Sequence, residues 1–252
     1  MPELRNKPGG HLHPIGSAIR EIAVIFAELG FAVAEGPEME TEHYNFDALN
    51  FPKDHPARDM QDTFWLKQPK GEVKSQKSKV KSERLLLRTH TSPVQIRYME
   101  NRLAAGIKPP YRIIAPGKVF RNEATDATHE AQFYQVEGLY VDKVVSTAHL
   151  KGVLLHFFKK YFGDDVAIKF RPSFFPFTEP SVEVFLRWKD RWLEVMGAGL
   201  VHPNVLSAAG LDPKEYQGFA FGGGVDRLVM LRYGVEDIRL FYSGDLRLVG
   251  QF

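Results

Sequence analysis

Residues 118–141 place several reactive side chains on two short segments that can pair as a hairpin. Residues 125–129 between them are rich in turn formers. Alternation with period 2 puts one set of side chains on a single face of this pair. That face would carry an arginine, two acids, an amide and an aromatic ring: Arg121, Glu123, Glu137, Gln135 and Phe133. The set suits a small ligand with an anionic group, a flat ring and an ammonium, and a solvated hairpin with a salt-bridged face is the alternative.

A second candidate site is the run from Gly222 to Arg227, which reads Gly-Gly-Gly-Val-Asp-Arg. Glycines let a ligand approach the backbone closely, and a helix that begins here would favour an anion at its N-terminus. Arg227 is placed to hold a phosphate by two hydrogen bonds. The spacing matches neither a Walker motif nor G-x-G-x-x-G. A simple packing turn explains three glycines nearly as well.

Two further stretches could complete a binding site. Phe175-Pro-Phe177 puts two rings on a segment rich in proline, where they could clamp a flat apolar ligand or belong to the core. Arg88-Thr-His90-Thr-Ser92 offers hydroxyls and an imidazole at a predicted helix start. These groups could bind a carboxylate or an ammonium, and plain N-capping by Ser92 is the alternative.

Composition excludes several classes of protein. The chain has 252 residues, a net charge of +2 and no cysteine, so disulfides and thiolate metal sites are excluded and a reducing cytosol is compatible. The charge is too small to indicate nucleic-acid binding by itself, and no apolar run is long enough to span a membrane. No convincing nucleophile–base pair, paired acids or metal-spaced histidines occur. The chemistry indicated is therefore positioning and charge neutralisation, with little acid–base work by the protein.

The elements that must position these residues follow from periodicity and from helix and strand end signals. Apolar spacing predicts a helix over 14–30, whose wide stripe would pack on the core of the chain itself or, in part, on a partner. The Lys- and Ser-rich stretch 67–84 reads as an exposed, mobile hairpin tip, with contact to RNA as the less favoured reading. The other predicted elements of the first half are a strand at 31–35, short helix and loop at 38–60, a hairpin of 62–66 with 85–89, a helix after the N-cap Ser92, and a strand at 111–115.

The second half alternates helices with antiparallel strands. Its predicted elements are helices at 146–162, 202–209 and 225–233, strands at 168–171 and 218–222, an aromatic loop at 172–180 fixed by three prolines, an antiparallel pair of 181–188 with 191–196, and a break at 197–199. No strand–helix–strand rhythm repeats. The order predicts an α+β fold with a mixed, largely antiparallel sheet.

Several motifs in one order resemble the class II aminoacyl-tRNA synthetases. Phe-Arg121-Asn-Glu123 resembles motif 2 of that class, Gly222–Arg227 resembles motif 3, and residues 14–37 resemble the dimer-forming motif 1. Within the class, the stretches 88–93, 135–138, 175–180, 197–203 and 218–222 look like the alpha-subunit family of bacterial phenylalanyl-tRNA synthetases. The resemblance covers residues 13–252 as one catalytic domain, with 1–12 as a linker remnant.

The resemblance implies a role for individual residues. Arg121 and Arg227 would be the catalytic arginines, on the α- and γ-phosphates of ATP. The ATP-binding set would be Arg121, Glu123, His129, Phe133, Gly224 and Arg227. The phenylalanine-binding set would be His90, Ser92, Gln135, Glu137, Phe175, Phe177, Ala220 and Gly222. Glu179 would bind Mg²⁺, at a site that the family shares with its beta subunit.

The implied activity is ATP-dependent formation of phenylalanyl-adenylate, followed by transfer to tRNA(Phe) with a beta subunit, in the cytoplasm and away from any membrane. By this resemblance the sequence would begin in the linker that follows the family's N-terminal tRNA-binding coiled coil, and the insert at 71–83 matches no family pattern. Both departures bear on tRNA charging more than on adenylate formation. Two other readings are open: a catalytically reduced paralogue that binds an amino acid or nucleotide, and an interaction protein whose task is motif 1 pairing.

Overall fold

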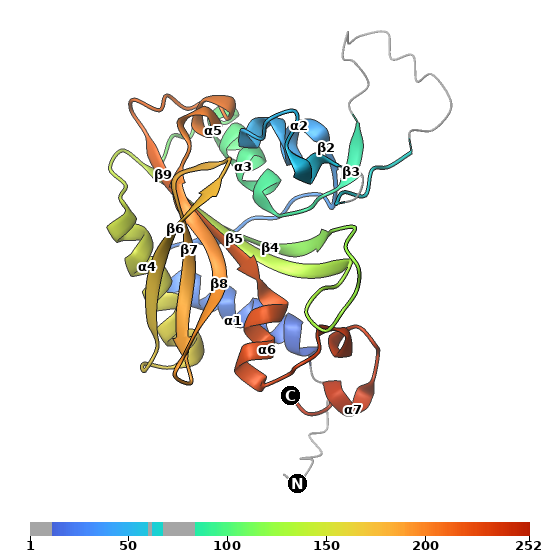
Figure 1. The fold of residues 1–252 in the computed structure, drawn as a ribbon. Coiled ribbons are helices and arrows are strands. Elements are labelled where there is room, and N and C mark those ends of the chain that lie inside the picture. The colour runs from blue at the N-terminus through green and yellow to red at the C-terminus, as the bar shows by residue number, and fades with distance from the viewer. Residues whose placement is uncertain (1–11, 60–61, 68–83) are drawn as a thin grey trace.

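One mixed sheet of seven strands forms the centre of the molecule, in the order β1-β4-β5-β9-β8-β7-β6 (Figure 1). The computed structural model describes residues 12–59, 62–67 and 84–252. Among these, β1 pairs with β4 in parallel and every other pairing is antiparallel. The strands are β1 Ala32–Val33, β2 Met39–Thr41, β3 Leu85–Leu87, β4 Tyr111–Phe120, β5 Gln132–Asp142, β6 Ala167–Phe175, β7 Thr178–Trp188, β8 Arg191–Val201 and β9 Gln217–Gly224. The predicted α+β class is confirmed.

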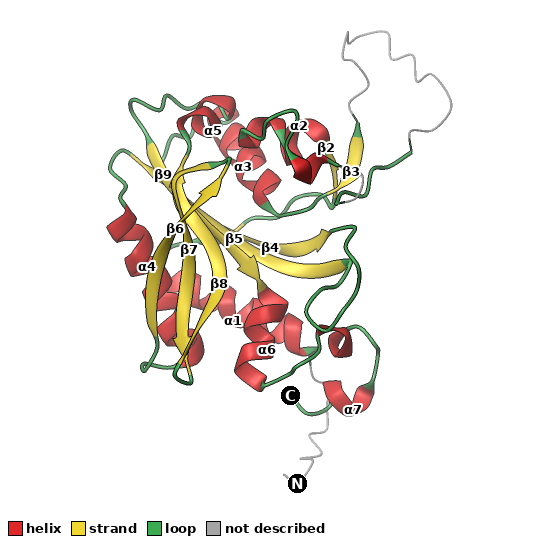
Figure 2. Ribbon diagram, viewed as in Figure 1, coloured by secondary structure: helices red, strands yellow, loops and turns green. Residues whose placement is uncertain are grey.

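Helices cover both faces of this sheet, and Figure 2 shows the sheet running between them. One face packs against α1, α4 and α6 in a large apolar cluster that includes Phe26, Phe157 and Phe221. The other face packs against α3, α5 and the short helix η1 in a second cluster around Ile113 and Leu139. The helices are α1 Pro14–Glu28, α2 Glu42–Asn45, α3 Ser92–Ala104, α4 Thr147–Phe162, α5 Pro203–Ala208, α6 Val225–Tyr233 and α7 Leu246–Val249, with 3₁₀ turns η1 Asp47–Leu49, η2 Pro56–Arg58 and η3 Ile238–Phe241.

The hairpin of β4 and β5 runs along the centre of the sheet, as its alternation predicts. Gly117 pairs with Gln135 and Ala115 with Glu137, so these four residues share one face. Strand β9 then pairs with the other edge of β5, with Gly222 opposite Glu137. The central hairpin and the glycine run are therefore neighbours in space, although about ninety residues separate them in the chain.

The predicted pairing of 62–66 with 85–89 forms in part. Trp65 bridges Leu86, and the Leu66 and Leu87 N–H groups donate to the Leu85 and Phe64 carbonyls. Three other local predictions were wrong. The aromatic loop at 172–180 is instead a tight hairpin between β6 and β7. Strand β8 continues through 197–199. Gly197 and Gly199 are needed within the strand because neighbouring groups come so close that a Cβ would clash. Thr91, not Ser92, occupies the N-cap of α3, and the Ser92 hydroxyl points elsewhere.

The wide apolar stripe of α1 is mostly taken up by this chain's own core. Ile15, Ala18, Ile22, Ile25 and Phe26 are all buried against the sheet and neighbouring helices. Val24 is the exception and is 64% exposed. The predicted tip at 67–84 and the linker remnant at 1–12 lie almost wholly outside the described residues.

Candidate active site

A cavity of about 810 Å³ opens on the α3 side of the sheet, over β5, β8 and β9. Its walls come from the segment 89–92, the turns at 46–51, the β6–β7 hairpin and the start of α6. Twelve of the residues singled out in the sequence line it: His90, Ser92, Arg121, Glu123, His129, Gln135, Glu137, Phe175, Phe177, Ala220, Gly222 and Arg227. The fold thus brings four separate stretches of sequence to one site.

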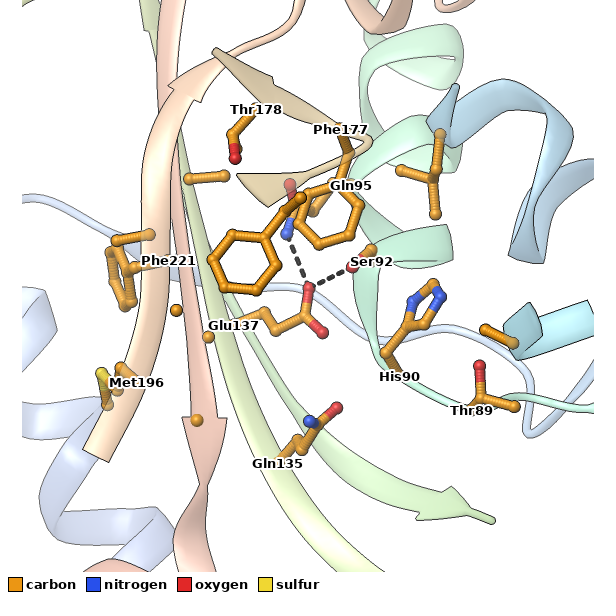
Figure 3. Close-up of a pocket in the computed structure, with 18 of the residues that line it drawn as sticks. Thr89, His90, Ser92, Gln95, Gln135, Glu137, Phe177, Thr178, Met196 and Phe221 are labelled. Carbon is orange, nitrogen blue, oxygen red and sulfur yellow. Dashed lines mark hydrogen bonds between the residues drawn. The ribbon is translucent and has the colours of Figure 1, made fainter. Parts of the chain in front are cut away.

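The Glu137 carboxylate lies near the middle of this cavity and is 7% exposed (Figure 3). It accepts hydrogen bonds from the Ser92 hydroxyl at 2.5 Å, the Gln95 amide at 3.0 Å and the Thr91 backbone N–H at 3.1 Å. Burial raises the pKa of Glu137, while these donors act in the opposite direction. A ligand ammonium would be a suitable counter-charge for a carboxylate held this way.

Two more polar side chains face the cavity beside Glu137. The Gln135 Oε1 atom is buried and accepts no hydrogen bond from any described residue. A buried acceptor without a donor is costly, so a ligand N–H is the natural partner. His90 stacks on Phe51, with ring centroids 5.9 Å apart, and burial together with the charge of Arg121 lowers its pKa to about 3. His90 is therefore a neutral imidazole at neutral pH.

The other end of the cavity is aromatic. Phe175 and Phe177 stack with centroids 5.9 Å apart and planes 11° from parallel. Gly197 lies under Phe175, since a Cβ on it would be 2.8 Å from the ring. The turn is fixed further by Asn50, whose amide donates to the Pro176 carbonyl at 2.7 Å. The pair of rings is thus held from β8 and from η1, and a flat apolar group can pack against it.

The opposite end carries the two arginines. Arg121 follows β4, donates from Nε to the Thr89 carbonyl at 3.2 Å, and has its guanidinium carbon 5.1 Å from the centre of the Phe133 ring. Arg227 is in the first turn of α6 and donates to the Glu194 carbonyl at 3.0 Å. Burial lowers the pKa of Arg121, which remains far above neutrality as for any arginine. Two cations at one end of a cavity suit a polyphosphate.

Three of the predicted residues do not line the cavity. Phe133 lies beside it, under Arg121. Gly224 is the N-cap of α6, and it pairs with Gln135 at the end of β9. The Glu179 side chain is 74% exposed and pairs with His202 Nε2 at 3.3 Å.

The predicted Mg²⁺ site is only partly present. The described residues hold no cluster of three groups that could ligate a metal, and Glu179 with His202 supplies at most two. Mg²⁺ prefers six oxygen ligands, and of this pair only the Glu179 carboxylate supplies oxygen, so phosphate oxygens, water or a second chain would have to supply the rest. The assignment of Glu179 therefore stays a prediction.

Sequence reasoning missed other residues that shape the site. The sequence did not single out Gln95, yet its amide donates to the Glu137 carboxylate. Thr178 and Met196 line the aromatic end. A glutamine three residues after Ser92 is on nearly the same helix face, and this i, i+3 spacing was the available signal for Gln95. No nearby sequence pattern marked Thr178 or Met196 as site residues, because the pairing register between strands decides whether their side chains face the cavity.

Comparison with known proteins identifies the family of this chain. Residues 2–252 match the family model "tRNA synthetases class II core domain (F)". Curated relatives include the phenylalanine–tRNA ligase alpha subunits of Prochlorococcus marinus (strain MIT 9313), 52% identical over 97% of this chain and 67% of the relative, and of Dechloromonas aromatica (strain RCB), 52% identical over 98% and 72%. That of Shouchella clausii (strain KSM-K16) is 52% identical over 96% of this chain and 69% of the relative. The chain belongs to the class II tRNA synthetase core family and, within it, to the phenylalanine–tRNA ligase alpha subunits.

Proposed function

We propose that this chain activates L-phenylalanine with ATP to give phenylalanyl-adenylate and pyrophosphate, and that with a beta subunit it transfers the phenylalanyl group to tRNA(Phe). The observation that carries the proposal is the order of groups in one cavity. Stacked rings lie at one end, a hydrogen-bonded carboxylate in the middle and two arginines at the other end. Phenylalanine followed by ATP presents a ring, an ammonium and a polyphosphate in the same order.

In the first step a carboxylate oxygen of phenylalanine attacks the α-phosphorus of ATP, and the bond to the pyrophosphate leaving group breaks. Glu137 and Gln135 would hold the ammonium, so that the carboxylate of phenylalanine points toward Arg121. Arg121 would neutralise the charge that develops on the α-phosphate, and Arg227 would hold the γ-phosphate. Glu123, His129 and Phe133 would contact the nucleotide base.

No proton has to move during this step, because both the attacking and the leaving groups are already anionic. The protein therefore contributes mainly by orientation and by fixed positive charge. When bound, Mg²⁺ would neutralise phosphate oxygens, and we propose that Glu179 contributes to holding it at the rim. His90 and Ser92 would define the amino-acid end, with Ala220 and Gly222 on its floor.

In the second step a ribose hydroxyl of the tRNA attacks the carbonyl carbon of the adenylate, and AMP leaves with the hydroxyl proton. The described residues contain no helix able to cross a membrane. A cytoplasmic location, where tRNA is charged, belongs to the proposal.

The alternative of a catalytically reduced paralogue has no specific observation in its favour, since both arginines and Glu137 face the cavity.

The direct test is phenylalanine-dependent exchange of pyrophosphate into ATP, measured with and without a beta subunit. We expect exchange with phenylalanine and much slower exchange with other amino acids. Charging of tRNA(Phe) is then measured with the assembled enzyme. Tight binding of phenylalanine or ATP without any exchange in the assembly would favour the non-catalytic paralogue instead.

A further inference from the structure

Arg88 is buried next to the active site without lining the cavity, and it is 4% exposed. Its Nε atom donates to the Lys118 carbonyl of β4 at 2.8 Å, and its Nη1 atom donates to the carbonyls of Gly36 at 2.9 Å and Pro37 at 3.3 Å. Among the described residues no ion pair within 4.0 Å involves this guanidinium. It therefore joins β4 to the bend after β1 by directional bonds to neutral oxygens.

Burying a charged group in this way is costly, and the nearby carboxylates of Glu38, Glu137 and Glu40 offset only part of that cost. Burial indeed lowers the pKa of Arg88. A well-packed apolar side chain would join the same segments at lower cost. What an apolar side chain lacks is direction, since a planar guanidinium fixes several acceptors at set angles.

The residues that follow Arg88 contact both Arg121, at the phosphate end of the cavity, and Glu137, which would bind the ammonium. The Arg88 carbonyl accepts from the Phe120 N–H at 2.9 Å, and the next carbonyl, of Thr89, accepts from Arg121. Two residues later, Thr91 and Ser92 donate to Glu137. A five-residue segment thus contacts the phosphate-end arginine on one side and the ammonium-binding acid on the other.

The neighbouring glycine of β4 is shaped to admit this side chain. A Cβ on Gly117 would lie 2.2 Å from Arg88 Nη2 and 3.2 Å from its guanidinium carbon. Gly117 also pairs with Gln135, in the floor of the site. The guanidinium consequently passes directly over the strand whose end carries Arg121.

We propose that Arg88 is a positioning residue, which sets the distance between Arg121 and Glu137 by locking the segment 88–92 against β4. The proposal rests on the adenylate-forming function above and adds a residue that touches neither substrate. It acts through Arg121 and Glu137. A purely structural role would lower stability while leaving the rate per folded molecule unchanged.

The test compares Arg88→Lys, Gly117→Ala and the double variant in phenylalanine-dependent pyrophosphate exchange by the assembled enzyme. Lysine keeps the charge but cannot reproduce the planar set of donors. The added methyl at Gly117 displaces the guanidinium while leaving Arg88 present. We expect each single variant to lower kcat roughly 10–100-fold, as a misplacement of about 1 Å can do. The KM values for phenylalanine and ATP should change less than about threefold.

The double variant tests whether Arg88 and Gly117 act through the same contact. Because both changes break one contact, we expect the double variant to be no slower than the slower single variant. Losses that multiply, or a kcat unchanged in the folded single variants, would overturn the proposal. Arg97→Lys is the matched control, since Arg97 makes a two-bond pair with Glu40 outside the cavity. The kcat of Arg97→Lys should match that of wild type. Absence of exchange in wild type would count against the proposed function and not against the role of Arg88.

Discussion

Arg121 combines burial, a fixed backbone partner and a place at the phosphate end of the cavity. Replacing it with alanine should lower phenylalanine-dependent exchange by at least about 100-fold, because a preorganised donor to a developing charge typically contributes that much. The fold should remain, since the side chain lies at the end of β4. Arg112→Ala is the control, because Arg112 packs over Tyr140 on the opposite face of the sheet. Near-normal exchange by folded Arg121→Ala would refute the assignment.

Ala220 lies between Phe219 and Phe221 on β9 and faces the cavity, whereas Phe219 packs in the core on the other side. Its methyl should limit the depth of the ring pocket. Ala220→Gly should raise the rate with para-chlorophenylalanine relative to phenylalanine roughly tenfold or more, in line with about 1–3 kcal/mol for a methylene-sized group.

A valine at the same position should block phenylalanine itself, because overpacking a closed site costs about 1–3 kcal/mol or more. Ala209→Gly offers a matched control, as Ala209 is buried in the same apolar cluster outside the cavity. An unchanged preference between the two substrates in Ala220→Gly would mean that this methyl does not set the pocket depth.

His90 gives a pH signature of the folded site. Its pKa is lowered by burial from the usual 6.5 to about 3, so between these values the unfolded chain binds a proton that the folded chain does not. The stability contribution is therefore fully present above pH 6.5 and is lost as the pH falls toward 3. The maximum slope is about 1.4 kcal/mol per pH unit.

The experiment is thermal unfolding of wild type and His90→Gln between pH 7.5 and 5, at about 0.5-unit steps. Wild type should lose more stability over this range than the variant. The pKa of Glu137 is raised by burial, so it titrates in the opposite direction and cannot imitate the effect of His90. Parallel curves for the two proteins would show that His90 is not buried as a neutral ring.

Among the elements, α1 is the predicted contact with a partner, but its exposed apolar surface is smaller than the sequence stripe indicates. Most of the stripe packs inside this chain, and Val24 is the large apolar side chain left outward on the helix. Val24→Asp should weaken assembly with a beta subunit or a second copy and leave the isolated fold intact. Light scattering measures the first effect and thermal unfolding the second. An assembly unaffected by this charge would place the interface elsewhere.

The long elements could be predicted from sequence because their periodicity is unambiguous. Helices α1, α4 and α6 and the central hairpin fall where the pattern puts them. Errors arose where contacts from distant strands decide the outcome. Gly197 reads as a strand breaker, yet the Phe175 ring needs that space and β8 runs on.

The candidate site shows the same division. Arg121, Glu137 and the two rings could be singled out because residue type and alternation mark them. Gln95 could not, and Arg88 was named only as part of the stretch 88–92, since the roles of both depend on which carbonyl or carboxylate the fold brings to them. Ser92 was expected to cap α3, but its hydroxyl donates to the buried Glu137 carboxylate instead.

For the molecule as a whole, the cavity holds groups for the amino acid and the phosphates, while the metal position is incomplete. Glu179 extends from the rim, and its carboxylate reaches only His202 among the ion-pair partners that the described residues provide. A divalent ion bound here would need oxygen ligands from a second chain or from substrate phosphates. The site should therefore become fully competent for Mg²⁺ only in the assembled enzyme with nucleotide bound.

This leads to a prediction that links assembly to metal use. Glu179→Gln in the assembled enzyme should raise the Mg²⁺ concentration needed for half-maximal exchange several-fold, because a neutral amide is a weaker ligand than a carboxylate. The isolated chain should show weak exchange with no difference between wild type and Glu179→Gln, since the remaining ligands are then absent. Glu183→Gln, at a carboxylate that pairs with Arg171, is the matched control. Equal Mg²⁺ dependence of all three assembled proteins would show that Glu179 does not hold the ion.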